Sequence, residues 1–287
     1  MYRTTTNHLM KHLVTTVFFG LLSLFTFSQP TIEIYLTNRP YQSKGASVES
    51  IEDNYELQIK EVQPSIPFKI ITRFDKIGNI ISQTKFGKAG GTISETNWEY
   101  NANQKLIKKT HRYFVNMLGW KVDETILGYN DTTGYISEIR FIKNGVLQST
   151  SKVFCDSIGS PFEIRVLDQK GAFASIEKIS LSPNANLTRV MILKPSGQFA
   201  GLWTYPIDST KPYQTPDVER QFYPNGDIML ESLEKKTKTD QGYYYEYNYD
   251  NQGNWVEKDT YQVTIGKNNK MKDKKLEHKI FRTIKYF

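Results

Sequence analysis

The sequence predicts an all-β fold, a single long antiparallel β-meander of repeated hairpins, from two observations. The first is a recurring turn pattern: an aromatic or apolar residue, usually Asp, Asn or Pro next, a short polar stretch, Gly, and a hydrophobic residue two positions later. Strong copies span residues 74–80, 223–228 and 249–255. The second is the alternation of hydrophobic and polar residues between turns, which is typical of half-buried strands. Such repetition indicates an architecture but specifies no reaction.

The repeated glycines mark the turns in order along the chain. In each copy Gly stands where the backbone can take a positive φ without steric cost. These positions are Gly78, Gly134, Gly159, Gly171, Gly197, Gly226 and Gly253, and Gln104 and Ala185 stand where two more would be expected. Weaker turn signals lie at residues 88–91, 116–119, 143–145 and 239–242. Strands between these turns account for the chain without room for helices.

The predicted strands follow the same order. Residues 46–62 form the most helix-like stretch, but we interpret it as a strand around Tyr55, because a second strand at 68–74 follows the proline-containing break at 63–67. Residues 243–249 place tyrosines on one face of a strand, and a C-terminal strand does the same with Ile280, Ile284 and Tyr286. Abundant Tyr (18) and Phe (16) favour strands, since aromatic rings pack well across neighbouring strands.

The late repeats also resemble a known family. The run from Tyr249 to Trp255, followed by a charged strand and a terminal Lys-Tyr-Phe, resembles the YD-repeat (Rhs-type) β-repeat proteins. The copy at 223–228 and the segment 201–205 are similar to MORN-variant repeats. The resemblance covers roughly residues 46–287 and implies a continuous, curling antiparallel sheet without enzymatic activity of its own. Cys155 and Leu167 depart from the pattern, because an aromatic residue or Asp would be usual there.

The N-terminus predicts export. A basic lead with Arg3 and Lys11 precedes an apolar run at 13–27, and Thr26 and Ser28 are small residues suited to a cleavage site. The run is shorter than the ~20 residues that a membrane-spanning helix needs. We therefore predict a signal peptide at 1–28 and a single β-repeat domain at 29–287, located in the periplasm, at the cell surface or outside the cell, with no transmembrane span after cleavage. A retained anchor is the alternative.

The net charge of +7 is concentrated near the C-terminus. The basic residues there are Lys267, Lys270, Lys272, Lys274, Lys275, Lys279, Arg282 and Lys285. These residues could bind an anionic partner. Alternatively, they could form a solvated loop and an edge strand whose lysines prevent aggregation, which is the interpretation that we favour. Nucleic acid is not expected as a partner of an exported chain. Cys155 is the single cysteine, so no intramolecular disulfide forms, and we expect a small buried side chain.

No catalytic, cofactor-binding or metal-binding residue is predicted. Outside the signal segment the histidines are His111 and His278, and neither has metal-ligand spacing. No nucleophile elbow, phosphate loop or dinucleotide fingerprint occurs. Carboxylates that could form a glycosidase pair are Glu95, Glu99, Asp123, Glu124, Glu138 and Glu163, but most alternate with hydrophobic residues as outward-facing side chains do. Asp75, Asp131, Asp250 and their Asn neighbours are interpreted as turn caps rather than calcium ligands.

These features predict an exported, non-catalytic β-repeat protein of the bacterial cell envelope that recognises or scaffolds a protein or a glycan. The alternative is a glycan-acting hydrolase with a cryptic carboxylate pair. Binding anchors are expected among the aromatic residues of 243–255, helped by the lysines of 267–275. Trp98, Trp120, Trp203 and Trp255 could instead form a sugar-binding platform, or simply pack against neighbouring strands.

Overall fold

The computed structural model describes residues 30–38, 40–41, 43–57, 67–208, 211–213, 218–233, 240–266 and 271–287. The predicted signal peptide at 1–28 lies outside these residues. The described residues contain the short helix α2 (Glu33–Thr37), the 3₁₀ turn η2 (Pro183–Ala185) and seventeen strands. No helix in the described parts of the chain is long and apolar enough to cross a membrane.

The strands divide almost the whole described chain into hairpins. They are β1 (Val48–Leu57), β2 (Lys69–Phe74), β3 (Ile80–Phe86), β4 (Thr92–Tyr100), β5 (Leu106–Val115), β6 (Gly119–Tyr129), β7 (Ile136–Lys143), β8 (Val146–Cys155), β9 (Pro161–Asp168), β10 (Phe173–Ser182), β11 (Leu187–Leu193), β12 (Phe199–Pro206), β13 (Val218–Phe222), β14 (Ile228–Leu233), β15 (Asp240–Tyr249), β16 (Trp255–Ile265) and β17 (Met271–Tyr286). The predicted strand around Tyr55 is confirmed as β1 and the one at 68–74 as β2, while residues 58–62 lie outside the described residues.

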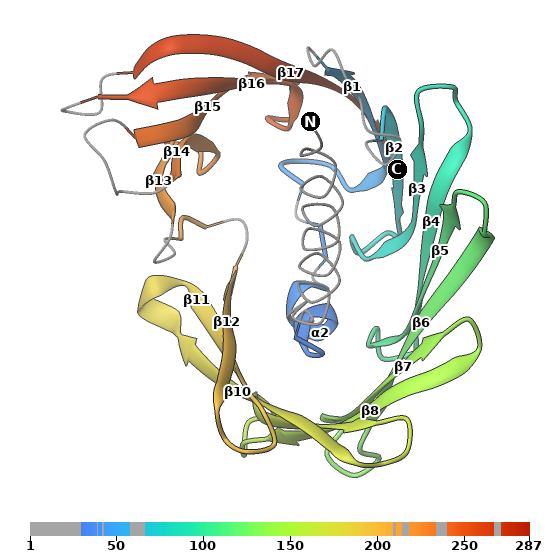
Figure 1. Ribbon diagram of the computed structural model, residues 1–287. Helices are drawn as coiled ribbons and strands as arrows, with labels where there is room; N and C mark the ends of the chain where they lie inside the picture. The colour runs from blue at the N-terminus through green and yellow to red at the C-terminus, as the bar shows by residue number, and fades with distance from the viewer. Residues whose placement is uncertain are drawn as a thin grey trace, which may run out of the picture.

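All seventeen strands join one antiparallel sheet, which confirms the predicted long meander. Each strand from β2 to β11 pairs with the next, and so does each strand from β13 to β16. β1 lies between β17 and β2 and pairs with both. No pairing joins β12 to β13 in the described residues, so these strands form the two sheet edges. The sheet curls around a central space that contains α2 (Figure 1).

The repeat turns share one hydrogen-bonding arrangement. The turn-opening Asp or Asn accepts, through Oδ1, the backbone N–H groups two and four residues later at Asp75, Asn101, Asp156, Asp168 and Asp250. In the turn after β6, Asn130 caps the backbone and Asp131 does not. The predicted role as turn caps is therefore met at Asp75, Asp250 and Asn130, and it was wrong for Asp131.

The glycines at the seven predicted turn positions all have positive φ. Gln104 takes the same conformation, with φ of 59°. The prediction for Ala185 was wrong by one residue, because Asn186 adopts the left-handed conformation, with φ of 52°. Asn tolerates this conformation better than Ala, since its side chain bonds locally. Here that side chain also accepts the N–H of Asp208 at 2.8 Å.

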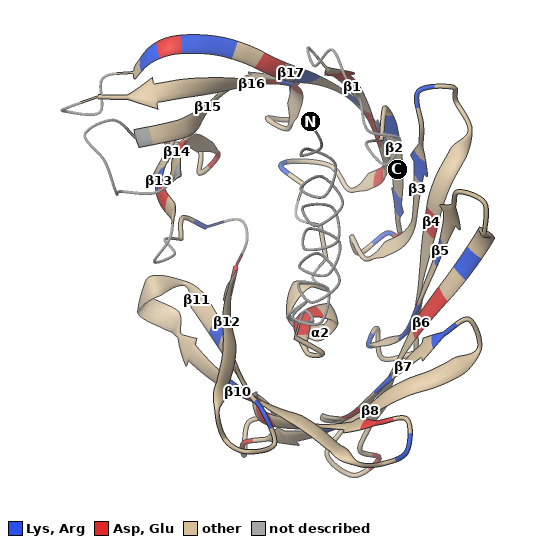
Figure 2. Cartoon of the chain, viewed as in Figure 1, with Lys and Arg blue, Asp and Glu red and all other residues tan. Residues whose placement is uncertain are grey.

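Three further expectations were wrong. Gly242 is not in a turn but inside β15, where a side chain would collide with the backbone of Glu231 on β14. A helix, α2, occurs in a segment where none was expected. β17 is not an edge strand throughout, because residues 271–281 pair with β16, residues 278–286 pair with β1, and residues 278–281 pair with both (Figure 2 shows its basic residues).

The main core lies on the concave face of the sheet, against α2. Ile32 is fully buried there among apolar residues of seven strands, namely Leu106, Leu127, Ile136, Ile139, Val153, Ile164, Val166, Ile179 and Val190. Ile34, Tyr35 and Leu36 of the same segment pack against this cluster. A smaller cluster of Val48, Ile51 and Phe74 holds β1 and β2 together. The sheet thus buries one face around a segment of its own chain.

A ladder of hydroxyl-to-carbonyl hydrogen bonds links successive repeats on this face. Its acceptors are carbonyl groups two residues after the left-handed turn residue. Tyr100 donates to Ile80 at 3.0 Å, Tyr129 to Leu106 at 2.8 Å, Tyr247 to Ile228 at 3.0 Å, and the thiol of Cys155 to Ile136 at 3.4 Å. Cys155 therefore makes the tyrosine's contact with a smaller group, which explains the departure from the repeat at this position.

Replacing Tyr129 with Phe should lower the free energy of unfolding by about 1 kcal/mol, because the Leu106 carbonyl loses a hydrogen bond in a half-buried site. Urea denaturation followed by far-ultraviolet circular dichroism measures the change. Tyr135→Phe is the control: its hydroxyl bonds Ser157 at the exposed surface, so the change should stay within ~0.5 kcal/mol. Equal losses in both variants would contradict the ladder.

Candidate functional site

A small groove lies where the turn after β13 meets the end of β15. Its cavity of about 330 Å³ is lined by Tyr223, Pro224, Asn225, Glu246, Tyr247 and Tyr249. We call this set the tyrosine groove. Ligand sites in proteins are commonly concave and aromatic, with a few polar groups, and this groove has both an amide and a carboxylate among its lining residues.

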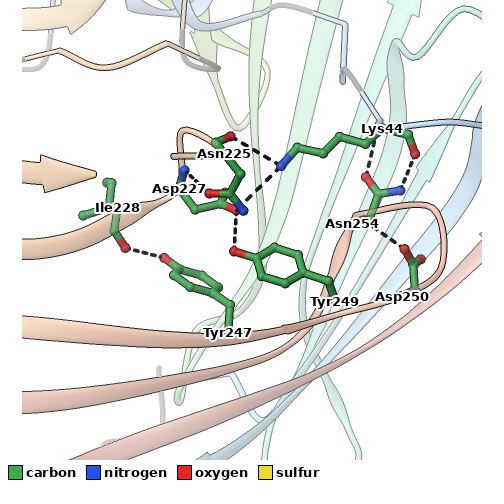
Figure 3. Close-up of polar contacts among 8 residues, drawn as sticks. All are labelled: Lys44, Asn225, Asp227, Ile228, Tyr247, Tyr249, Asp250 and Asn254. Carbon is green, nitrogen blue, oxygen red and sulfur yellow. Dashed lines mark hydrogen bonds and ion pairs between the residues drawn. The ribbon is translucent and has the colours of Figure 1, made fainter. Parts of the chain in front are cut away.

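The tyrosine rings of the groove are held by their hydroxyl groups. Tyr223 donates to the backbone carbonyl of Tyr245 at 2.9 Å. Tyr247 donates to the backbone carbonyl of Ile228, and Tyr249 to Oδ2 of Asp227 at 2.8 Å (Figure 3). The rings of Tyr223 and Tyr247 meet edge to face, with centroids 6.1 Å apart. Because each phenol is fixed at its tip, the ring faces are positioned before any ligand arrives.

Lys44 connects the groove to the neighbouring turn of the last strong repeat. Its ammonium lies 3.7 Å from Oδ2 of Asp227 and 3.5 Å from the carbonyl of Asn225. Its backbone N–H donates to Oδ1 of Asn254 at 2.9 Å, and Nδ2 of Asn254 donates to its carbonyl at 2.8 Å (Figure 3). The segment before β1 thereby joins two repeat turns, and Tyr286 donates to Asp250 beside them.

Burial and nearby carboxylates raise the pKa of the tyrosine phenols in the groove. Loss of water is the main cause that raises the pKa of Tyr249 to about 12; the hydrogen bond to Asn225 opposes this rise, and the hydrogen bond to Asp227 adds to it. Desolvation is also the main cause that raises the pKa of Tyr223 and of Tyr247 above the ordinary value. The groove therefore presents neutral, hydrogen-bonding phenols over the whole physiological pH range.

The raised pKa of Tyr249 has a consequence for stability at alkaline pH. An unfolded phenol ionises near pH 10, so the folded state is favoured below that pH and loses this contribution as the pH rises towards 12. Tyr249→Phe should remove one phenol that ionises near pH 12 from an ultraviolet absorbance titration, and should make the alkaline loss of stability less steep. Loss of a phenol that ionises near pH 10 would contradict the assignment.

Of the predicted anchors around 243–255, Tyr247 and Tyr249 line the groove. Lys274, from the predicted basic segment, bonds Glu246 at 2.6 Å and lies 3.8 Å from the ring centroid of Tyr261. Lys267 and Lys270 lie outside the described residues. Trp255 stacks on the guanidinium of Arg282, 3.4 Å from its ring centroid, and is not part of the groove lining.

The four tryptophans do not form one platform. Trp98 packs against the concave core, and Trp203 lies over Gly201 on β12. Trp120 is exposed beside Phe114. In the β5 register Lys109 is opposite Trp98 and Phe114 is opposite Trp120. Positions 109 and 114 point to opposite faces, so Trp98 and Trp120 are separated by the sheet.

Most of the six candidate carboxylates form ion pairs on the convex face. The pairs are Glu95–Arg112 at 3.5 Å, Glu124–Lys108 at 2.6 Å, Glu138–Lys152 and Glu163–Lys178. Asp123 lies on the concave face opposite His111, whose Nδ1 is 2.9 Å from Oγ1 of Thr96. None of the six lines the tyrosine groove. The described residues also contain no cluster of His, Cys, Asp and Glu suited to a metal ion.

Sequence reasoning missed the polar partners of the groove. Asp227 could have been noticed, since it follows the turn glycine of a strong repeat. Lys44 gave no local signal, because it reaches residues 181 to 210 positions away in the chain. Only the position of β1 beside β17 brings it there.

Neither a protein-family profile nor a curated protein sequence matches the chain. Among solved structures, a porin-like protein from Bacteroides uniformis is similar at 14% identity and a TM-score of 0.33, over 83% of this chain and 98% of that one. The Tc holotoxin pore of Photorhabdus luminescens is similar at 13% identity and a TM-score of 0.33, over 71% of this chain. The aligned region spans 14% of the toxin chain.

Proposed function

We propose that the protein is an exported, non-catalytic binding protein of the cell envelope that recognises a glycan through the tyrosine groove. The observation that carries this proposal is the groove itself, in which three tyrosine rings and the polar side chains of Asn225 and Glu246 line one cavity of about 330 Å³. A sugar ring offers C–H groups to an aromatic face and hydroxyl groups to amides and carboxylates. The groove supplies partners for both.

Binding is favoured over hydrolysis by the setting of the groove's carboxylate. A glycosidase needs two carboxyl groups flanking the bond, about 5–10 Å apart. Glu246 is the acidic residue of the groove lining, and it is neutralised by Lys274 at 2.6 Å. Asp227, nearby, is bonded by both Tyr249 and Lys44. These partners engage both carboxylates in contacts within the protein.

A glycan array probed with the secreted protein, followed by calorimetry of the best ligand, tests the proposal. Tyr249→Ala should weaken binding at least tenfold, because a ring of the groove is lost. Tyr135→Ala, at a repeat turn outside the groove, should leave the affinity unchanged. If no glycan binds, or if both variants bind as the original protein does, the groove is not the site.

The non-catalytic part of the proposal needs its own measurement. The secreted protein is incubated with chromogenic glycoside substrates in parallel with the array. We expect no turnover. Turnover that disappears in Glu246→Gln, with an unchanged circular dichroism spectrum, would replace the binding function with hydrolysis.

Export is tested by the mass of the protein recovered from outside the cytoplasm. A chain that begins at Gln29 is expected. An intact mass that retains residues 1–28, with the protein in the membrane pellet, would exclude the predicted processing.

A further inference from the structure

Glu177 is a buried acid with no cationic partner in the described residues. It lies in β10 on the concave face, directly opposite Ile164 of β9 and Ile192 of β11, and its side chain is nearly inaccessible, with 2% of the residue exposed. Burial raises the pKa of this carboxyl. Burying a carboxylate among aliphatic side chains is costly unless hydrogen-bond donors satisfy it, so this position requires donors from elsewhere in the chain.

The donors are two consecutive backbone amides of the segment that precedes α2. The N–H of Thr31 donates to Oε1 of Glu177 at 2.6 Å, and the N–H of Ile32 donates to Oε2 at 3.2 Å. Each carboxylate oxygen thus takes one amide, in a bidentate arrangement. Ile32, with 0% exposure, inserts into the apolar cluster beside it. Glu177 therefore binds the main chain of the segment, and the apolar cluster binds the side chain of Ile32.

The segment itself has little structure of its own. α2 has five residues and no side-chain cap, and a single helical turn is not stable in isolation. None of the residues 30–37 pairs with a strand in the described sheet. The pocket, in contrast, is built by strands that are hydrogen-bonded on both sides. The segment therefore sits in this pocket as a bound peptide would, held by side-chain contacts and two amides.

The segment also leaves part of the concave face unfilled. A cavity of about 850 Å³ remains beside it, lined by Glu33, Ile34 and Thr37 from the segment and by Lys109, Phe141 and Ser149 among the sheet residues. Ser151 Oγ and Tyr205 Oη are buried without a hydrogen-bond partner in the described residues. Burial is the main cause that raises the pKa of the Tyr205 phenol, and the nearby carboxyls of Glu33 and Glu177 raise it further. Polar groups and space are thus present that residues 30–37 do not use.

We propose that the concave pocket around Glu177 is a polypeptide-binding site, and that residues 30–37 occupy it as a displaceable ligand in cis. The ligand in trans is an apolar peptide segment of a partner protein with two consecutive free backbone N–H groups and an Ile-like side chain on the second residue. Proline at either of these two residues is excluded, since it has no N–H group. This site is separate from the tyrosine groove and does not depend on the glycan proposal.

A fluorescent peptide with the sequence of residues 30–38 tests the site by fluorescence polarisation against the full chain. Ile32→Asp in the protein removes the cis anchor, and this variant should bind the peptide at least tenfold more tightly than the original protein does. Adding Glu177→Gln should reduce binding at least tenfold. Adding Glu163→Gln, on the convex face of the adjacent strand, should leave it unchanged.

The amide contact is isolated by a second peptide, N-methylated at the residues equivalent to Thr31 and Ile32. It keeps the side chains, including the Thr31 hydroxyl that also favours the Glu177 carboxylate, but lacks both amide donors, and it should bind more weakly than the first peptide. Ile32→Ala replaces Ile32→Asp if the latter does not fold, as judged by circular dichroism. The proposal is overturned if a folded variant binds neither peptide, if both peptides bind equally, or if Glu177→Gln has no effect.

Discussion

Replacing Gly78 with Ala should destabilise the protein by about 3 kcal/mol, since a non-Gly residue at positive φ costs ~1 kcal/mol or more and displacing packed backbone costs ~1–3 kcal/mol. Gly78 has φ of 90°, and an added Cβ would lie 2.5 Å from the carbonyl oxygen of Tyr41. Its own carbonyl accepts the N–H of Tyr41 at 2.7 Å. The substitution therefore strains the turn and also displaces the segment that enters β1.

Gly197→Ala separates these two effects. Gly197 has φ of 81° in an equivalent turn, and an added Cβ would meet no atom within 4 Å. This variant should lose only the ~1 kcal/mol of backbone strain. Gly253→Val, with a β-branched residue but with Lys44 no closer than 3.7 Å, should lose ~1–2 kcal/mol or more. Guanidinium unfolding gives all three values, and an equal loss at Gly78 and Gly197 would show that the Tyr41 contact contributes nothing.

Arg282→Met should lower the free energy of unfolding by about 3 kcal/mol or more, because it leaves the largely buried Asp53 carboxylate without its cationic partner. The two residues face each other across β1 and β17, and their side chains are each 13% exposed. Nε and Nη2 of Arg282 bond the two oxygens of Asp53 at 2.7 and 2.9 Å. The guanidinium also covers the ring of Trp255, so the substitution removes packing together with charge.

Two companion variants show whether the orphaned charge is the cause. Adding Asp53→Asn to Arg282→Met should recover at least half of the lost free energy of unfolding, since the uncompensated carboxylate disappears. Lys285→Met breaks the exposed pair with Glu49 on the same two strands and should cost less than ~1 kcal/mol. A double variant as unstable as Arg282→Met alone would assign the loss to packing on Trp255 instead.

How much of the fold could be predicted depends on how locally each feature is determined. The left-handed turns at Gly78 and Gly253 could be predicted, because a positive φ is a requirement of one residue and its neighbours. Alternation likewise indicated that carboxylates such as Glu138 point outward, where the ion pairs lie. Gly242 was assigned to a turn because a close approach of two strands and a turn call for the same residue, and only the partner strand distinguishes them.

The candidate sites were predicted only in part, for the same reason. Tyrosines on one face of 243–249 indicated an aromatic surface, and Tyr247 and Tyr249 do line the groove. Glu177 gave no signal, since a Glu that alternates with apolar residues is the usual pattern of a solvated strand. Its partners lie 145 and 146 residues earlier in the chain. A buried acid in a β-repeat is recognisable only once the occupant of the concave face is known.

The placement of β1 has a consequence for the order in which the sheet assembles. The hairpins from β2 to β12 and those from β13 to β17 consist of neighbouring strands and can form as the chain emerges, since short loops close at little entropic cost. β1, although made first, has half of its hydrogen-bonding partners in the last strand, with Val48 opposite Tyr286. It can complete the sheet only after the final residues appear. During synthesis, β1 must therefore wait unpaired on one side until β17 has followed, and it then joins two preformed arrays into one.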